Sequence, residues 1–135
     1  MPFRFTRHVE FRDTDAAGIV HFSVFFNYME AAEHAFWRSL GVSVLTQDDL
    51  GPISWPRVAV SCQYNNPLRF EDQFAVEVQV ARLGRTSVTF DFLFSRNDES
   101  IAVGQMTAVC CRLTDEGRPV PTPVPESIAE KLRAV

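Results

Sequence analysis

The chain has 135 residues, of which 46% are hydrophobic and 22% charged. That length is typical of one domain, and the apolar fraction is too high for a disordered chain. No stretch approaches the roughly 18 unbroken apolar residues of a membrane-spanning helix. Thirteen basic residues against seventeen acidic ones give a formal charge of −4, which disfavours a nucleic-acid partner because phosphate binding needs a basic surplus. We therefore predict one domain over residues 1–135, with no membrane span and no nucleic acid bound.

The N-terminus and the cysteines indicate a compartment. Residues 1–7 lack the apolar core of a signal peptide. The three cysteines, Cys62, Cys110 and Cys111, show no CxxC spacing, so neither a disulfide framework nor a zinc site is expected. These features predict a cytoplasmic protein with reduced thiols.

The first part of the chain predicts a strand and a long helix. Residues 3–11 alternate between apolar and polar, which is typical of a strand. Turn-forming residues follow, and residues 23–40 then carry apolar side chains at three- and four-residue spacing. Ser23 and Gly41 suit the N-terminal and C-terminal caps of this helix. Both of its flanks are apolar, so we expect neighbouring elements to cover most of it.

After a connection at 42–52, the remaining pattern predicts mostly strands. These cover about 57–64, 73–80, 87–95 and 101–113, with a short terminal helix over 126–134. The order of strand, helix and four strands joined by short turns predicts an α+β domain with an antiparallel sheet. The faces carrying Phe74 to Val80 and Phe90 to Phe94 are expected to bury the helix. The last long strand is apolar on both faces, which favours dimerisation.

The helix carries a polar cluster of Glu30, Glu33 and His34. Neighbouring residues on a helix point about 100° apart, and the ExxH pair of helical metal sites is absent. We therefore interpret the cluster as a polar stripe and predict no metal.

The segment before the helix holds the residues best suited to chemistry. Asp13, Asp15 and Gly18 directly precede it. The first N–H groups of a helix have no intrahelical partner and can polarise a carbonyl, while a nearby carboxylate can attack that carbonyl or activate water. Together they could perform acyl transfer or hydrolysis. From the residues alone, capping and turn formation by Asp13, Thr14 and Asp15 is the favoured explanation.

A specific motif occupies this same segment, residues 9–22, with the sequence VEFRDTDAAGIVHF, and Tyr28-Met29-Glu30 follows. It resembles the signature of the 4-hydroxybenzoyl-CoA thioesterase family of hotdog-fold acyl-CoA thioesterases. Weaker similarity continues at 66–72 and 84–87. The resemblance implies a hotdog fold, in which an antiparallel five-stranded sheet wraps around one long central helix. It also implies hydrolysis of an acyl-CoA to free acid and CoA without a cofactor, by a homodimer or homotetramer with its active site between protomers.

The resemblance assigns catalytic roles by position. Asp15 matches the catalytic carboxylate, which acts as nucleophile or as general base. The backbone N–H of Phe22 matches the group that polarises the thioester carbonyl. Gly18 is expected to let the loop approach the substrate closely, and Asp13 to brace the loop.

The predicted substrate-binding residues are His21, Phe25, Phe26, Glu30, Arg82 and Arg85. Arg85, with Arg82 nearby, matches a turn that contacts the CoA phosphates in relatives. Glu30 matches an acid at the acyl end of the pocket, although a bond within the dimer interface is equally compatible. The phenylalanines suit an aromatic or medium-chain acyl group, and they suit core packing equally. His21 is expected to line the pocket.

Two other functions stay open. A hydratase or dehydratase acting on an acyl-thioester would need His21 and Asp15 to converge on the β-carbon. A non-catalytic acyl-CoA-binding protein would keep the pocket without turnover. Aroyl, naphthoyl and short- to medium-chain acyl groups are all compatible with the sequence.

Overall fold

The computed structural model describes residues 2–135, and its elements follow the predicted order with additions. They are β1 (Phe3–His8), the 3₁₀ helix η1 (Phe11–Asp13), α1 (Val24–Ser39), β2 (Thr46–Asp48), β3 (Gly51–Ile53), β4 (Arg57–Tyr64), β5 (Gln73–Leu83), β6 (Ser87–Arg96), β7 (Glu99–Val109), β8 (Cys111–Leu113), β9 (Pro119–Pro121) and α2 (Glu126–Arg133).

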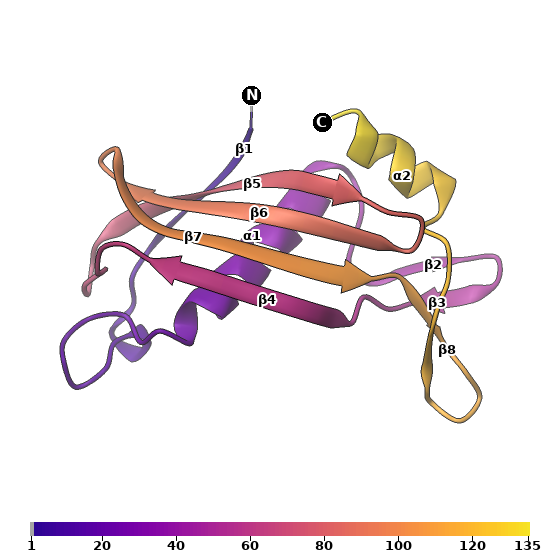
Figure 1. Ribbon diagram of the computed structural model, residues 1–135, viewed down its shortest axis with the longest axis horizontal. Coiled ribbons are helices and arrows are strands. Elements are labelled where there is room, and N and C mark those ends of the chain that lie inside the picture. The colour runs from indigo at the N-terminus through magenta and orange to yellow at the C-terminus, as the bar shows by residue number, and fades with distance from the viewer. Residues whose placement is uncertain (1) are drawn as a thin grey trace.

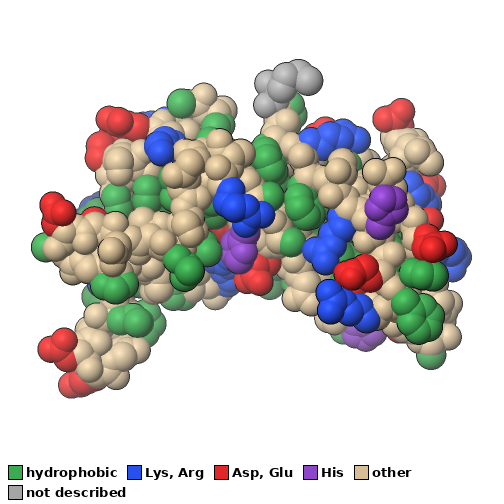
Figure 2. Space-filling view, turned by 180° about the vertical axis from the view of Figure 1, so that it is seen from behind, with side chains coloured by type: hydrophobic (Ala, Val, Ile, Leu, Met, Phe, Trp, Pro, Cys, Tyr) green, Lys and Arg blue, Asp and Glu red, His purple; other side chains and the backbone are tan. Residues whose placement is uncertain are grey.

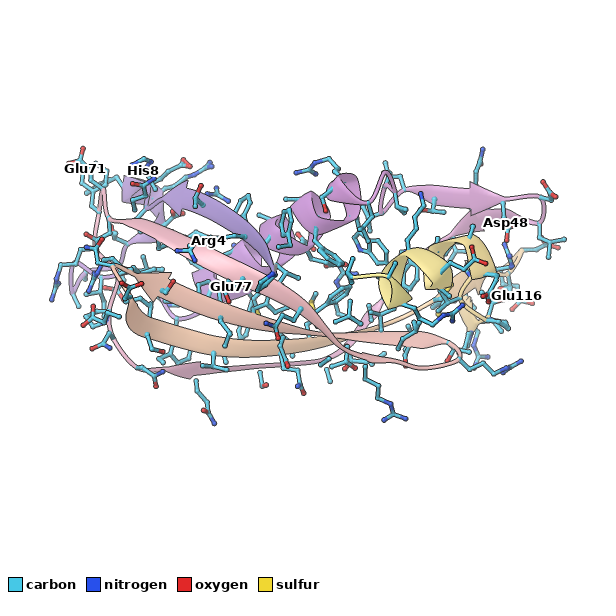
Figure 3. The ribbon with its side chains drawn as sticks, turned by 90° about the horizontal axis from the view of Figure 1, so that it is seen from above. Arg4, His8, Asp48, Glu71, Glu77 and Glu116 are labelled. Carbon is cyan, nitrogen blue, oxygen red and sulfur yellow. The ribbon has the colours of Figure 1, made fainter. Side chains whose placement is uncertain are left out.

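The main sheet has five strands in the order β1-β5-β6-β7-β4, and every neighbouring pair is antiparallel. Figure 1 shows this sheet crossing the front of the molecule, with α1 running diagonally behind it. The view from above in Figure 3 places the helix on one side of the curved sheet. The predicted α+β architecture, a five-stranded antiparallel sheet around one long helix, is confirmed.

Alternation along the central strands builds the core. Phe74, Val76 and Val78 of β5 and Phe90, Phe92 and Phe94 of β6 are all buried. On α1 the buried residues recur at three- and four-residue spacing: Phe25, Tyr28, Met29, Ala32, Glu33, Phe36 and Trp37. Each large apolar side chain buried in this way contributes about 1.5–3 kcal/mol. The predicted contact between these strand faces and the helix is confirmed.

Most of α1 is covered, as the sequence predicted, and only a narrow side of it stays exposed. Asn27, Glu30 and Arg38 are exposed, and Figure 2 shows charged and apolar side chains mixed on the face behind the sheet. The sheet wraps the helix from one side, so the apolar spacing marks only the stripe that faces it.

The observed ends of several strands also differ from the prediction. β1 stops at His8, because Glu10 and Asp13 form a reciprocal capping box that starts η1. Residues 42–52 contain β2 and the start of β3, which pair as a hairpin. The strand predicted over 101–113 breaks at Cys110, whose N–H donates to the Thr86 carbonyl instead of to a strand of the main sheet. β8 then pairs with β9.

Candidate active site

The loop between β1 and α1 folds back on itself as a small hairpin. Thr14 and Val20 form an isolated bridge, and the Asp15 N–H donates to the Ile19 carbonyl at 2.9 Å. Gly18 sits at the turn with a φ of +81° and with open space where a Cβ would lie. Its left-handed backbone therefore accounts for the glycine, and no contact among residues 2–135 requires the missing side chain.

Asp13 holds this loop through hydrogen bonds. It is 8% exposed, and its Oδ2 accepts hydrogen bonds from the Glu10 N–H at 2.9 Å and the Tyr28 hydroxyl at 2.8 Å. Burial, together with the bond to Asp13, raises the pKa of Tyr28 far above its ordinary value, so its hydroxyl stays a donor. Asp13 is thus held in the bracing position that the sequence predicted.

Asp15 is held differently and keeps a free oxygen. Its Oδ1 accepts the Ala17 N–H at 2.8 Å, which orders the turn. The other carboxylate oxygen has no hydrogen-bond partner within residues 2–135, and the residue is only half-buried. Asp15 can therefore present one oxygen to a substrate or a water molecule.

Phe22 lies just before α1, which begins at Val24. Its N–H donates to no acceptor within the described residues, whereas the neighbouring Val24 N–H donates to the His21 carbonyl at 2.9 Å. Ser23 occupies the N-cap position as predicted, but its side chain does not cap the helix. The Phe22 N–H is thus a free donor near the positive end of the helix dipole.

A cavity of about 520 Å³ brings these groups together. Asp15, Phe22 and Phe25 line one side, and residues 64–67 line the other, together with Ile19 and Val20. Phe25 is 3% exposed, and its ring meets that of Tyr64 edge-on, with 5.1 Å between centroids. In Figure 1 the loop and the end of β4 lie at the same lower corner of the molecule. Asp15, which has a free carboxylate oxygen, and Phe22, which has a free backbone N–H, therefore line the same partly aromatic pocket.

His21 and Phe26 are not among the residues that line this cavity. The Nδ1 of His21 lies 2.8 Å from the Ser23 Oγ and accepts the Ser23 N–H at 3.3 Å. The His21 ring also lies 4.6 Å from that of Phe22, so the histidine supports the Phe22 turn.

Residues 9–132 match the thioesterase-like superfamily. The chain belongs to that family. This chain is 34% identical over 133 residues to a protein of Aquifex aeolicus that is provisionally named an esterase. The match covers 98% of this chain and 99% of the Aquifex protein. A protein of Synechococcus elongatus named 1,4-dihydroxy-2-naphthoyl-CoA hydrolase is 29% identical over 97% of this chain and 95% of its own. The solved structure of a gentisyl-coenzyme A thioesterase superimposes with a TM-score of 0.83, at 26% identity over 96% of this chain and 99% of that one. The predicted hotdog-fold thioesterase is confirmed.

Glu30 and Glu33 of the thioesterase differ sharply in environment. Glu30 is exposed, and its carboxylate lies 4.0 Å from the Arg57 guanidinium, away from the cavity. Glu33 is fully buried; it accepts the Trp37 Nε1–H at 2.9 Å and pairs with Arg57. The predicted polar stripe is wrong for Glu33, which is part of this buried network. The spacing of Glu33 and Trp37, one helical turn apart, was the available signal.

Arg82 and Arg85 lie far from Asp15 within one copy of the thioesterase. Both are exposed. Arg82 is near the end of β5 and Arg85 is in the turn between β5 and β6, and this turn lies at the opposite end of the sheet from the β1–α1 loop (Figure 1). Figure 3 marks the two ends, with His8 and Glu71 at one and Asp48 and Glu116 at the other. Arg82 lines a separate cavity of about 740 Å³ between β1, β5, α2 and the C-terminal end of α1. A single chain therefore does not bring these arginines to the Asp15 cavity.

Within residues 2–135 no three His, Cys, Asp or Glu side chains cluster closely enough to hold a metal ion. None of the described helices is both long and apolar enough to cross a bilayer.

Proposed function

We propose that this thioesterase hydrolyses an aroyl-CoA to the aromatic acid and free CoA. The observation that carries the proposal is the shared cavity of Asp15 and the free Phe22 N–H. The aromatic rings of Phe22, Phe25 and Tyr64 along its walls suit a flat acyl group. Two of the relatives carry the names of thioesterases for aromatic acyl groups.

The proposed reaction uses both groups at the thioester carbon. The Phe22 N–H donates to the carbonyl oxygen and stabilises its negative charge as a tetrahedral intermediate forms. Asp15 either attacks the carbonyl carbon or removes a proton from an attacking water molecule. Collapse of the intermediate breaks the C–S bond, and the CoA thiolate leaves and takes up that proton. With Asp15 as nucleophile, water then hydrolyses the acyl-aspartate and supplies the proton for CoA.

We further propose that a second copy completes the site, as a homodimer or a pair of dimers. β4 is an edge strand of the sheet, and Val58 and Val60 on it are 62% and 47% exposed. An open, apolar edge favours pairing with another strand. A partner's Arg82 and Arg85 could then supply the CoA phosphates with cations that one chain does not bring to Asp15.

The free cysteines and the proposed CoA substrate favour a cytoplasmic location. Cys62, Cys110 and Cys111 are all free, and burial raises the pKa of Cys110 to about 11, which keeps that thiol protonated and unreactive. Free thiols and a CoA substrate both suit a reducing compartment.

The function is tested by measuring the release of free thiol from a panel of aroyl-, naphthoyl- and aliphatic acyl-CoAs with a thiol-reactive dye. We expect hydrolysis, with the highest kcat/KM on an aroyl-CoA. Consumption of an enoyl-CoA without thiol release would support a hydratase instead. Calorimetric binding of acyl-CoA with no turnover would support a binding protein.

A further inference from the structure

Tyr64 connects the edge of the sheet to the turn that presents the Phe22 N–H. It is the last residue of β4, and its hydroxyl donates to the Phe22 carbonyl oxygen at 2.8 Å across 42 residues of sequence. The motif at residues 9–22 does not predict this contact, because Tyr64 lies outside the motif, 42 residues after Phe22.

The Phe22 carbonyl depends on that bond. In a regular helix this oxygen would accept the Phe26 N–H, but the Phe26 N–H donates to the Ser23 carbonyl instead, at 3.2 Å. Two peptide units meet at Phe22. The unit that carries the Phe22 N–H is held through the His21 carbonyl, which accepts the Val24 N–H. The unit that carries the Phe22 carbonyl is held by Tyr64 and by the Ser23 N–H, which donates to the His21 Nδ1 at 3.3 Å. Because both units join at the Phe22 Cα, loss of the Tyr64 bond would also let the Phe22 N–H change direction.

The Tyr64 ring is itself held in place. It packs edge-on against the buried Phe25 ring, and burial raises the pKa of the Tyr64 hydroxyl above its ordinary value. The hydroxyl therefore stays protonated and remains a donor at neutral pH.

We infer that Tyr64 is a positioning residue for catalysis: its hydroxyl fixes the Phe22 turn so that the Phe22 N–H points at the thioester carbonyl. The inference rests on the proposed hydrolysis of an acyl-CoA. Because the thioester carbonyl is common to all acyl-CoAs, the effect of Tyr64 on turnover does not depend on the acyl group.

The variant Tyr64→Phe tests this role, since it removes the hydroxyl and keeps the ring. Misplacing a reacting group slightly lowers the rate strongly, so we expect kcat to fall about tenfold on aroyl and aliphatic acyl-CoAs alike, with KM nearly unchanged. Thr107→Val is the matched control. It removes another hydroxyl hydrogen bond of 2.8 Å, between Thr107 and Thr89 on the outer face of the sheet, and we expect it to leave kcat unaltered.

A second measurement needs no substrate. In ¹H–¹⁵N spectra of the free protein, Tyr64→Phe should shift the Phe22 and Ser23 amide resonances and speed their hydrogen exchange, while Thr107→Val should not. A normal kcat with unmoved amides would overturn the inference, and so would a loss of turnover confined to hydroxylated aroyl groups, which would make Tyr64 a substrate contact. If the wild-type protein released no thiol, the proposed function would fail, and the Phe22 amide would still decide whether Tyr64 positions the turn.

Discussion

Glu33 is a fully buried carboxylate on the central helix. Burial raises its pKa, and the Arg57 charge and the Trp37 hydrogen bond oppose that effect. Isolated buried charges are costly, so such a group persists only where partners surround it. Glu33 therefore joins α1 to the start of β4 through Arg57.

The raised pKa gives Glu33 a distinct pH signature. The folded protein holds the Glu33 proton more tightly than the unfolded chain does, whose carboxyl has the ordinary pKa of 4.5. Its contribution to the free energy of unfolding is thus fully present below pH 4.5 and is lost as the pH rises through the raised pKa of the folded protein.

The variant Glu33→Gln removes this titration. Urea unfolding at several pH values should show the wild-type advantage over Glu33→Gln shrinking as the pH rises above 4.5. An advantage that grows with pH would mean that the ion pair with Arg57 dominates.

Single residues were predicted unevenly from the sequence. The buried bracing position of Asp13 agrees with its place in the motif, and the catalytic role of Asp15 stays a prediction. Glu33 could not be placed, because its main partner, Arg57, is 24 residues away, and nothing in local spacing reports such a contact. Tyr64 was missed for the same reason.

At the scale of elements, Gly104 allows α1 to lie close to the sheet. A Cβ on Gly104 would come within 2.9 Å of the Met29 Sδ and closer still to its terminal methyl group. Met29 is fully buried, so a larger side chain at residue 104 has little room.

We expect Gly104→Leu to lower the free energy of unfolding by about 1–3 kcal/mol through overpacking. Adding Met29→Ala to that variant should recover part of the loss, because it opens the space that the new side chain needs. The two free energies can be compared by chemical denaturation. Equal stability of Gly104→Leu and the wild type would contradict the close approach.

Elements with strong periodicity were predicted well, and their ends were not. The helix and the central strands follow from apolar spacing, because that spacing reports which side chains the core buries. β1 ends before a capping box, and β7 ends at Val109, just before Cys110. Hydrogen bonds to backbone groups end both strands, and such bonds do not change the spacing of apolar residues in the sequence. The β8–β9 pairing involves Pro119 and Pro121, residues usually confined to edge strands.

At the scale of the whole molecule, the proposed site needs two copies of the chain. The loop between β1 and α1, which contains Asp15, lies at one end of the sheet, and the β5–β6 connection, where Arg82 and Arg85 are found, lies at the other (Figure 1). If a partner supplies the arginines, then a subunit without Asp15 and a subunit without the arginines can form one complete site between them.

Mixing two weakened variants tests that arrangement. Asp15→Asn and the double variant Arg82→Ala/Arg85→Ala are each expected to have low activity on their own at limiting acyl-CoA. After refolding an equal mixture, random pairing should restore about a quarter of the wild-type activity, since about half the dimers are mixed and each has one complete site. No recovery, with mixed dimers present, would show that each site is made by one chain.

In the proposed reaction Asp15 carries out the chemistry, and the variant Asp15→Asn tests that role. The asparagine keeps an Oδ1 that can accept the Ala17 N–H, so the thermal unfolding midpoint should stay close to that of the wild type. It removes the carboxylate charge, so kcat for acyl-CoA hydrolysis should fall by roughly 10²–10⁴-fold. Near-normal turnover by folded Asp15→Asn across the acyl-CoA panel would contradict the account.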